Sequence, residues 1–386
     1  MCSIPAMASK SILRDFFSDL PDPRVERTRK HKLNDIILMV LVGMITGCRS
    51  WDSIHFFVKM GPPPLRALFE LPNGVPSADT LRRVISALDR EMFGKMFIRW
   101  SSALCKSTEG KLVAIDGKTV RGARRDSDGF GSLHLINAWV QENSIAIGQY
   151  ATDVKSNEIT AIPELLKLLS LKGAIVSMDA MGCQKKIAEA VRERGADYLF
   201  GLKGNQPSLQ KEVLESFDDA TCQALTTSED AFHESADKGH GRRELRRTWV
   251  LRDVDWLKKS DDWMDLKTLV LVESTRTLKG VTTTERRAYI SSLNASAERM
   301  AELTRAHWSV ENNLHWVLDV TFGEDHTRVS KRNGAENLAL IRKMALNMLK
   351  RAAVPDVSTS IVMRQRLAQF RPDYLGDVLA AGITQD

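Results

Sequence analysis

The sequence predicts an α/β fold in which a mixed sheet with flanking helices follows a helical N-terminal domain. Residues 1–100 contain helical patterns separated by proline-rich breaks, whereas from about residue 101 short apolar runs alternate with helical segments. Residues 207–295 are rich in β-branched residues of alternating polarity. We therefore expect a helical domain at 1–100, an α/β domain at 101–350 with a β-rich insertion at about 207–295, and a C-terminal tail at 351–386.

Composition narrows the class of protein. The 386 residues include 55 Lys or Arg and 49 Asp or Glu, and this excess of positive charge gives weak support for a polyanionic partner. The five cysteines contain no CxxC pair, so neither a zinc ribbon nor a disulfide framework is indicated. The longest apolar run, at 36–45, is about half as long as a bilayer span, and no signal peptide is recognisable. We therefore expect a cytoplasmic protein without membrane contact.

Short helices are predicted in the N-terminal domain. Their expected positions are 11–17 with Ser11 as a cap, an apolar helix from Leu33, and Trp51–Lys59. The segment from residue 76 to 85 resembles the entry to a DNA-recognition helix, because Ser77 can cap it and Arg82 and Arg83 follow. The alternative is an amphipathic helix with a solvated basic face.

Three strands are predicted to open the α/β domain, followed by alternating helices and strands. The expected elements are strands Leu112–Asp116, Leu133–Glu142 and Ser144–Thr152, helix Thr160–Leu171, strand Ala174–Asp179, helix Cys183–Arg194 and strand Asp197–Leu202. With a final helix, this order is the ribonuclease-H-like arrangement, in which the first and fourth strands lie side by side. Further elements are expected as strands at Glu244–Arg252, Lys267–Arg276 and Thr282–Ser291 and a helix at Ile361–Phe370, with an irregular end.

Three acidic residues, far apart in the sequence, are the strongest functional signal. Asp116 and Asp179 each end an apolar run that is expected to be a strand, and Glu311 lies at the edge of the apolar stripe of a helix. Carboxylates that converge in this way suit Mg²⁺, with Mn²⁺ as a substitute, because these ions prefer oxygen ligands. Two such ions can clamp a phosphodiester. An aspartate after a strand can equally be a turn former or a helix cap.

The histidines near Glu311 leave a second kind of metal site open. His307, Glu311 and His315 are spaced by four residues, so on a helix they would lie above one another as a ladder of zinc ligands. The HExxH motif of zinc hydrolases is absent. Phosphate contact or simple packing are the other interpretations of these histidines.

Basic and amide residues near the expected strand ends suggest contacts with DNA phosphates or bases. The residues concerned are Lys118, Arg121, Lys203, Asn205 and Gln206 in the core, and Arg242, Arg243 and Arg246 in a basic loop. For the loop, the alternative is a solvated hairpin.

Five sequence blocks, taken in order, resemble those of DDE transposases of bacterial insertion sequences, in the group that includes the H-repeat-associated proteins. The blocks are DGKTVRGA (116–123), VSMDAMGCQ (176–184), FGLKGNQP (200–207), KGHGRRELR (238–246) and HWSVENNLHWVLDVTFGED (307–325). Residues 12–95 are similar to that group's associated N-terminal domain. The resemblance implies a ribonuclease-H-like catalytic domain with a magnesium-dependent triad of Asp116, Asp179 and Glu311. It also implies double-stranded DNA as the partner, and a homodimer when two transposon ends are paired.

Around the glutamate the chain departs from the wider insertion-sequence pattern. Where relatives carry Tyr, Arg and Lys, this sequence has Thr304, His307 and Leu318. We expect Arg305, His307 or Lys331 to supply the phosphate contacts instead. Three functions fit the sequence: a DNA transposase that cuts transposon ends and joins them to target DNA, a metal-dependent nuclease without strand transfer, and an inactive DNA-binding remnant.

Overall fold

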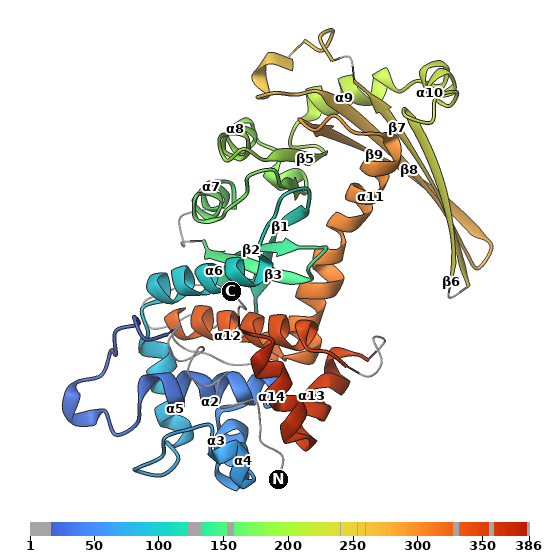
Figure 1. Ribbon diagram of the computed structural model, residues 1–386. Helices are drawn as coiled ribbons and strands as arrows, with labels where there is room; N and C mark the ends of the chain where they lie inside the picture. The colour runs from blue at the N-terminus through green and yellow to red at the C-terminus, as the bar shows by residue number, and fades with distance from the viewer. Residues whose placement is uncertain are drawn as a thin grey trace.

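The computed structural model describes residues 17–121, 133–152, 158–239, 241–252, 254–258, 260–326, 332–354 and 359–383. The helix expected at 11–17 lies outside these ranges except for Phe17, and so does Lys331. Within them, the chain forms one mixed sheet with helices on both faces and a helical body at one end (Figure 1). The expected α/β class is confirmed.

Nine strands of the described chain form the sheet, in the order β3-β2-β1-β4-β5-β9-β8-β7-β6. The first five in sequence are β1 (Leu112–Val120), β2 (Leu133–Val140), β3 (Ile145–Ala151), β4 (Ile175–Met178) and β5 (Asp197–Leu202). β1 is parallel to β4 and β4 to β5, whereas β2 is antiparallel to both β1 and β3. The first and fourth strands are therefore neighbours, as the sequence predicts.

β1 is longer than its apolar run. The sequence predicts that the strand ends at Asp116, but β1 stays paired with β2 as far as Val120, opposite Leu133. Asp116 consequently lies inside a strand. The prediction was too short because backbone pairing with β2, and not apolar side chains, continues the extended conformation.

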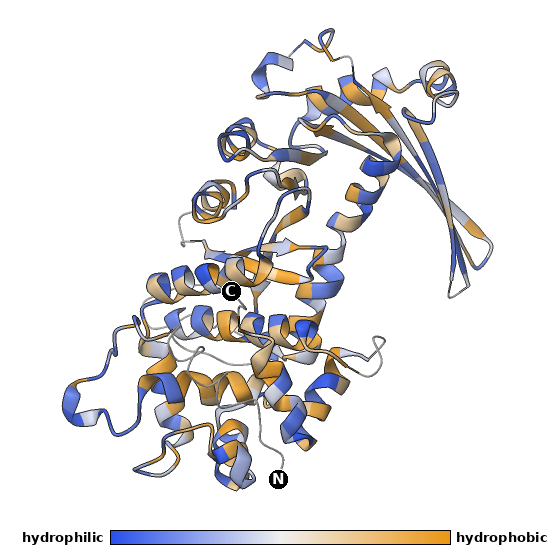
Figure 2. Cartoon of the chain, in the orientation of Figure 1, coloured by the Kyte–Doolittle hydropathy of each residue, from blue (hydrophilic) through white to orange (hydrophobic). Residues whose placement is uncertain are grey.

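The β-rich segment continues the same sheet beyond β5. Its strands are β6 (Phe232–Gly239), β7 (Arg242–Leu251), β8 (Thr268–Leu278) and β9 (Val281–Ser291), and β9 pairs with β5. The sequence predicts three of these strands but misses β6, whose residues are mostly polar. The strands are buried near β5 and exposed at their far ends, which project from the molecule (Figure 1) and carry mainly hydrophilic residues (Figure 2).

Helices cover both faces of the five core strands. Gly148 of β3 lies against α7 (Glu158–Leu168), and the next residue, Gln149, bonds with α12 (Arg332–Arg351) on the opposite face. α8 (Lys185–Glu193) packs against β5, while α11 (Ala297–His307) contacts β1, β4 and the β6–β8 strands. α9 (Pro207–Ser216) and α10 (Asp219–Leu225) lie against β9 and β7. α11, which directly precedes the segment with Glu311, is thus placed beside β1 and β4.

The N-terminal helices pack together with the C-terminal ones (Figure 1). They are α2 (Leu33–Ile45), α3 (Trp51–Met60), α4 (Pro63–Arg66), α5 (Ala78–Ala87) and α6 (Arg90–Cys105). α2 is almost fully buried, as its apolar sequence predicts. Among the described residues, no helix is both long and apolar enough to cross a bilayer.

Hydrogen bonds join the two ends of the chain within this helical body. Asn337 of α12 donates to the carbonyls of Ile85 and Leu88, and Gln365 of α13 (Ile361–Phe370) donates to that of Met44. α13 has the predicted bounds. The prediction of an irregular end after it is wrong, because α14 (Pro372–Ala380) forms there and buries its apolar face.

Candidate functional site

Two parallel strands bring Asp116 and Asp179 together. The last paired residues of β1 and β4 are Ile115 and Met178, which directly precede the two aspartates. The carboxylate Oδ1 of Asp179 accepts the backbone N–H of Met181 at 3.0 Å and of Gly182 at 3.4 Å, and so caps the turn η2 (Ala180–Gly182). Asp179 is therefore a helix cap, as one interpretation of the sequence predicts, and these bonds fix its carboxylate beside β1.

Glu311 reaches the same place on a π-helical segment. After α11 the chain forms two π-helical turns, η4 (Glu311–His315) and η5 (Val317–Thr321), and such turns are frequent at functional sites. Possible ligand atoms of Asp116, Glu311 and His315 all lie within 4.8 Å of one another. His315 Nδ1 is 3.4 Å from Asp116 Oδ2 and 3.7 Å from Glu311 Oε2. The sequence predicts the two acids here, and the zinc-ladder alternative places His315 beside Glu311 but not beside Asp116.

Asp116 shows the electrostatic effect of crowded acids. Burial, and then the negative charges of Glu311 and Asp179, raise the pKa of Asp116 to about 8. The neighbouring His315 imidazole instead holds the pKa of Glu311 below its usual range. Carboxylates that share a site resist joint ionisation unless a cation offsets their repulsion. These residues therefore fit a bound divalent metal ion.

The three acids line one pocket of roughly 620 Å³, which includes space open to solvent. Lys203, which follows β5, lies on its wall and is exposed. Arg287 of β9 also lines the pocket and lies over the Trp308 ring, 4.8 Å from its centre. The pocket thus combines an acidic cluster with two cationic side chains. Sequence reasoning missed Arg287, because it lies in an alternating β pattern without a motif.

His307 lies beside the acids but is not part of their cluster. Its buried Nδ1 is 2.9 Å from Ser177 Oγ on β4. Burial lowers the pKa of His307 to about 4, so the ring is uncharged near neutral pH. The predicted zinc ladder does not form in the described part of the chain, where Asp116 takes the place of His307 beside Glu311 and His315. A buried, uncharged ring gives no support to the phosphate contact predicted for His307.

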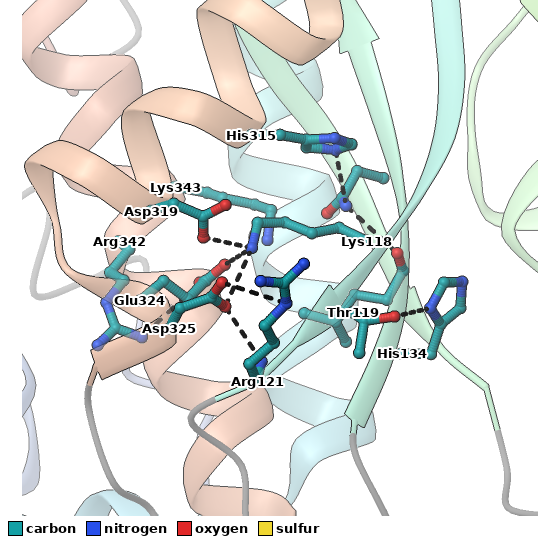
Figure 3. A network of polar contacts seen from close by, with 12 residues as sticks. Lys118, Thr119, Arg121, His134, His315, Asp319, Glu324, Asp325, Arg342 and Lys343 are labelled. Carbon is teal, nitrogen blue, oxygen red and sulfur yellow. Dashed lines mark hydrogen bonds and ion pairs between the residues drawn. The ribbon is translucent and has the colours of Figure 1, made fainter.

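Lys118 lies in a buried ion cluster. Its Nζ is 2.5 Å from Asp319 Oδ1, 3.3 Å from Glu324 Oε2 and 3.6 Å from Asp325 Oδ1 (Figure 3). Arg342 of α12 lies 3.7 Å from the other oxygen of Glu324. The structure does not support the DNA contact predicted for Lys118, because three carboxylates already surround its ammonium group. The cluster instead joins the end of β1 to η5 and α12.

Asn205 and Gln206 hold the turn that carries Asp179. The side-chain amide of Asn205 donates to the carbonyl of Ala180, and Gln206 Nε2 donates to that of Cys183 at 3.1 Å. The sequence predicts that these amides donate to phosphates or bases, but here they donate within the protein. These bonds occupy at least one N–H of each amide, so the structure gives no support to the DNA contacts predicted for Asn205 and Gln206, and those contacts remain predictions.

The arginines predicted to contact DNA at the end of β1 and on β7 lie at or near the surface. Arg121 at the end of β1 is 82% exposed, and Arg242 and Arg243 begin β7 at the projecting tip of the sheet. Arg246 is half-buried and bonds Glu244 through two nitrogens, at 2.7 and 3.0 Å. Exposed arginines at a projecting tip suit phosphate contact, and the predicted contacts there remain predictions.

Arg305 and the two arginines on the basic face of α5 form ion pairs with acidic residues of the protein. Arg305 forms an ion pair with Asp237 of β6. Arg82 and Arg83 both pair with Asp79, at 2.5 and 2.9 Å, on the exposed face of α5. The opposite face of α5 packs into the helical body, which matches the amphipathic alternative. DNA contact by this helix remains a prediction.

Thr304 and Leu318, two of the residues that depart from the insertion-sequence pattern, point into the protein. Thr304 is buried and donates to the carbonyl of Met300 at 2.9 Å, and Leu318 is fully buried. Both side chains are therefore largely removed from solvent. The structure therefore gives no support to a phosphate contact by Thr304 or Leu318.

Comparison with known proteins identifies the family of the chain. Residues 107–348 match the family model described as "Transposase DDE domain", and residues 14–101 match that described as "DDE_Tnp_1-associated". The chain is 37% identical to "Putative transposase YncI" of Escherichia coli O157:H7, over 97% of this chain and 96% of that protein. It is 38% identical to "H repeat-associated putative transposase YhhI" of Escherichia coli K12, over 95% and 97%. The chain therefore belongs to the DDE transposase family.

Proposed function

We propose that this protein is a DNA transposase in which Asp116, Asp179 and Glu311 hold divalent metal ions against a phosphodiester. The observation that carries the proposal is the convergence of these acids, from β1, the end of β4 and a π-helical turn, on one pocket. Membership of the DDE transposase family supports it.

The pocket residues have separate tasks in the proposed reaction. The bound ions, Mg²⁺ or Mn²⁺ in its place, would activate a water or a 3′-hydroxyl and stabilise the leaving oxygen. Asp116 interacts electrostatically with both other acids, so it would hold the ions together with Asp179 and Glu311. Lys203 and Arg287 add positive charge on the pocket wall, where it would stabilise the phosphate that reacts.

A ribonuclease-H-like core is part of the proposal. The side-by-side order of β3, β2, β1, β4 and β5, with β1 parallel to β4, supports it. The segment from α9 to β9 would then be the β-rich insertion that separates β5 from the helical segment carrying Glu311. The helices of residues 1–100 would form the DNA-binding N-terminal domain of a cytoplasmic protein.

Double-stranded DNA is the proposed partner, both as transposon ends and as target. The exposed arginines at the end of β1 and at the tip of β7 supply positive charge for DNA phosphates. A homodimer would allow two ends to be cut and joined together.

A cleavage and strand-transfer assay tests the function. The substrates are duplexes from the DNA that brackets the gene, including one pre-cleaved to expose a 3′-hydroxyl. Asp179→Asn should abolish Mg²⁺-dependent cutting and leave DNA binding largely unchanged, because it removes a ligand charge at constant volume. Asp262→Asn is the matched control, since Asp262 pairs with Lys185 on the surface at 2.6 Å. Cutting retained in Asp179→Asn would contradict the assignment.

The same assay separates the two alternative functions. Nicking of DNA without joining of the pre-cleaved end would identify a metal-dependent nuclease. Retention of DNA by the wild-type protein, without cleavage of any substrate, would identify an inactive DNA-binding remnant.

A further inference from the structure

His315 lies within reach of two of the three acids. Its Nδ1 is 3.4 Å from Asp116 Oδ2 and 3.7 Å from Glu311 Oε2, and both distances exceed those of ordinary N–H···O bonds. Two donor atoms that each lie about 2.1 Å from one metal ion are separated by roughly 3.0–3.4 Å. The spacing of these three side chains is therefore closer to that of a coordination shell than to that of a hydrogen-bonded pair.

The other nitrogen of His315 meets Asn137, which is fully buried on β2 directly opposite Asp116. The side-chain amide of Asn137 lies 3.4 Å from His315 Nε2, and its Oδ1 is buried without a hydrogen-bond partner among the described residues. Leaving a buried acceptor unpaired is unfavourable. Rotating the Asn137 amide by about 180° exchanges its Oδ1 and Nδ2 positions. Oδ1 then accepts the hydrogen of His315 Nε2, and the only hydrogen bond lost is the long one, 3.3 Å, from Nδ2 to the carbonyl of Leu135.

This arrangement prepares His315 Nδ1 to bind a metal ion. With the ring hydrogen on Nε2 and bonded to Asn137, the lone pair of Nδ1 faces the two carboxylates. Metal-binding histidines usually donate their second ring N–H to a fixed acceptor, which sets both the tautomer and the ring orientation. His315 is also buried, with only 5% of the residue exposed, so its ring has little freedom to turn away.

We propose that His315 Nδ1 is a third protein ligand of the divalent ion held between Asp116 and Glu311. The inference rests on the proposed function, because it adds a donor to an ion position of that site. This position offers one nitrogen and two carboxylates, whereas the position between Asp116 and Asp179 offers carboxylates alone. Mn²⁺ and Mg²⁺ both prefer oxygen ligands, but Mn²⁺, as a first-row transition ion, gains more from an added imidazole nitrogen than Mg²⁺ does, although less than the later ions Fe²⁺ to Zn²⁺. The two positions are therefore unequal, and Mn²⁺ binds more tightly beside His315.

Pulsed electron paramagnetic resonance of Mn²⁺ bound to the full-length protein tests this ligand. The wild-type protein should show the hyperfine coupling of a directly bonded imidazole nitrogen, and His315→Gln should lose it. His326→Gln, which removes an exposed imidazole later in the same segment, is the matched control and should keep the coupling. Loss of the ligand should weaken Mn²⁺ binding at least tenfold, and Mg²⁺ binding less.

Asn137 supplies a second readout. Asn137→Leu removes the acceptor of Nε2–H and should weaken Mn²⁺ binding by about 10–100-fold, the range for partners of metal-binding histidines. Asn137→Asp keeps an acceptor and should restore tight binding. A role confined to packing predicts the reverse, since leucine suits a buried position better than a charged aspartate.

The outcomes distinguish this inference from the proposed function. Mn²⁺ bound in the wild-type pocket without nitrogen coupling would overturn the inference and leave the function intact. Unchanged coupling and affinity in His315→Gln would do the same. Mn²⁺ binding that is indifferent to Asp116→Asn would overturn both. A wild-type spectrum without nitrogen coupling overturns the inference even where a variant fails to fold. Because His307 also lines the pocket, His315→Gln is needed to show which imidazole is coupled.

Discussion

The buried ion cluster predicts that Lys118→Met destabilises the protein without removing a contact to DNA. The Lys118 side chain is 6% exposed, and its partners Asp319, Glu324 and Asp325 are 34%, 0% and 20% exposed. Removing one member of a buried ion pair costs about 3–5 kcal/mol, because the other charges remain buried. Arg342 still lies beside Glu324, so we expect the lower end of that range, about 3 kcal/mol.

Urea unfolding, followed by two spectroscopic probes, measures this loss of stability. Lys167→Met is the matched control: Lys167 pairs with Glu164 at 2.7 Å, but their side chains are 57% and 47% exposed. Such surface pairs contribute about 0–1 kcal/mol. A Lys118→Met variant as stable as Lys167→Met would refute the structural role. A salt-dependence slope of DNA binding lowered by about 0.9 would instead indicate one lost phosphate contact.

Three further predictions follow from the site and its surroundings. Because the pKa of Asp116 is raised from 3.8 to about 8, the folded metal-free protein holds a proton that the unfolded chain has lost. Its free energy of unfolding should therefore fall by on the order of a few kcal/mol between about pH 4 and pH 8, and Asp116→Asn should flatten this fall; an equal fall in the variant would contradict it. Replacing both Arg242 and Arg243 with alanine should lower the salt-dependence slope of DNA binding by about 1.8, and an unchanged slope would exclude the β7 tip from the interface. Asn205→Ala should slow cleavage roughly 10–100-fold at unchanged DNA affinity, because the turn that carries Asp179 loses a support; weaker DNA binding at an unchanged rate would favour the DNA contact predicted from sequence.

The proximity of Asp116 and Asp179 could be predicted because it depends on local sequence patterns and on the order of the elements. Each aspartate follows a short apolar run, and the order of strands and helices makes their two strands neighbours. Glu311 could be placed on a packing helix from its apolar stripe. The π-helical form of that segment could not, because bonds from residue i to i+5 leave no distinct pattern of side chains.

The true partners of Lys118 and Asn205 could not be read from the sequence. Asp319 lies 201 positions from Lys118, and only the packed position of η5 brings it to the face of β1 that Lys118 shares with Asp116. For Asn205, an amide donor after a strand suits a protein carbonyl as well as a phosphate. The strand β6 was missed for a related reason, since pairing with β7 and not apolar alternation defines it.

Anomalous diffraction from crystals of the full-length protein soaked in Mn²⁺ tests the central assignment most directly. We expect a peak bonded to the carboxylates of Asp116 and Glu311, and a second ion position between Asp116 and Asp179. Ions bound only to acids elsewhere on the surface, with no peak in the pocket at saturating Mn²⁺, would contradict it.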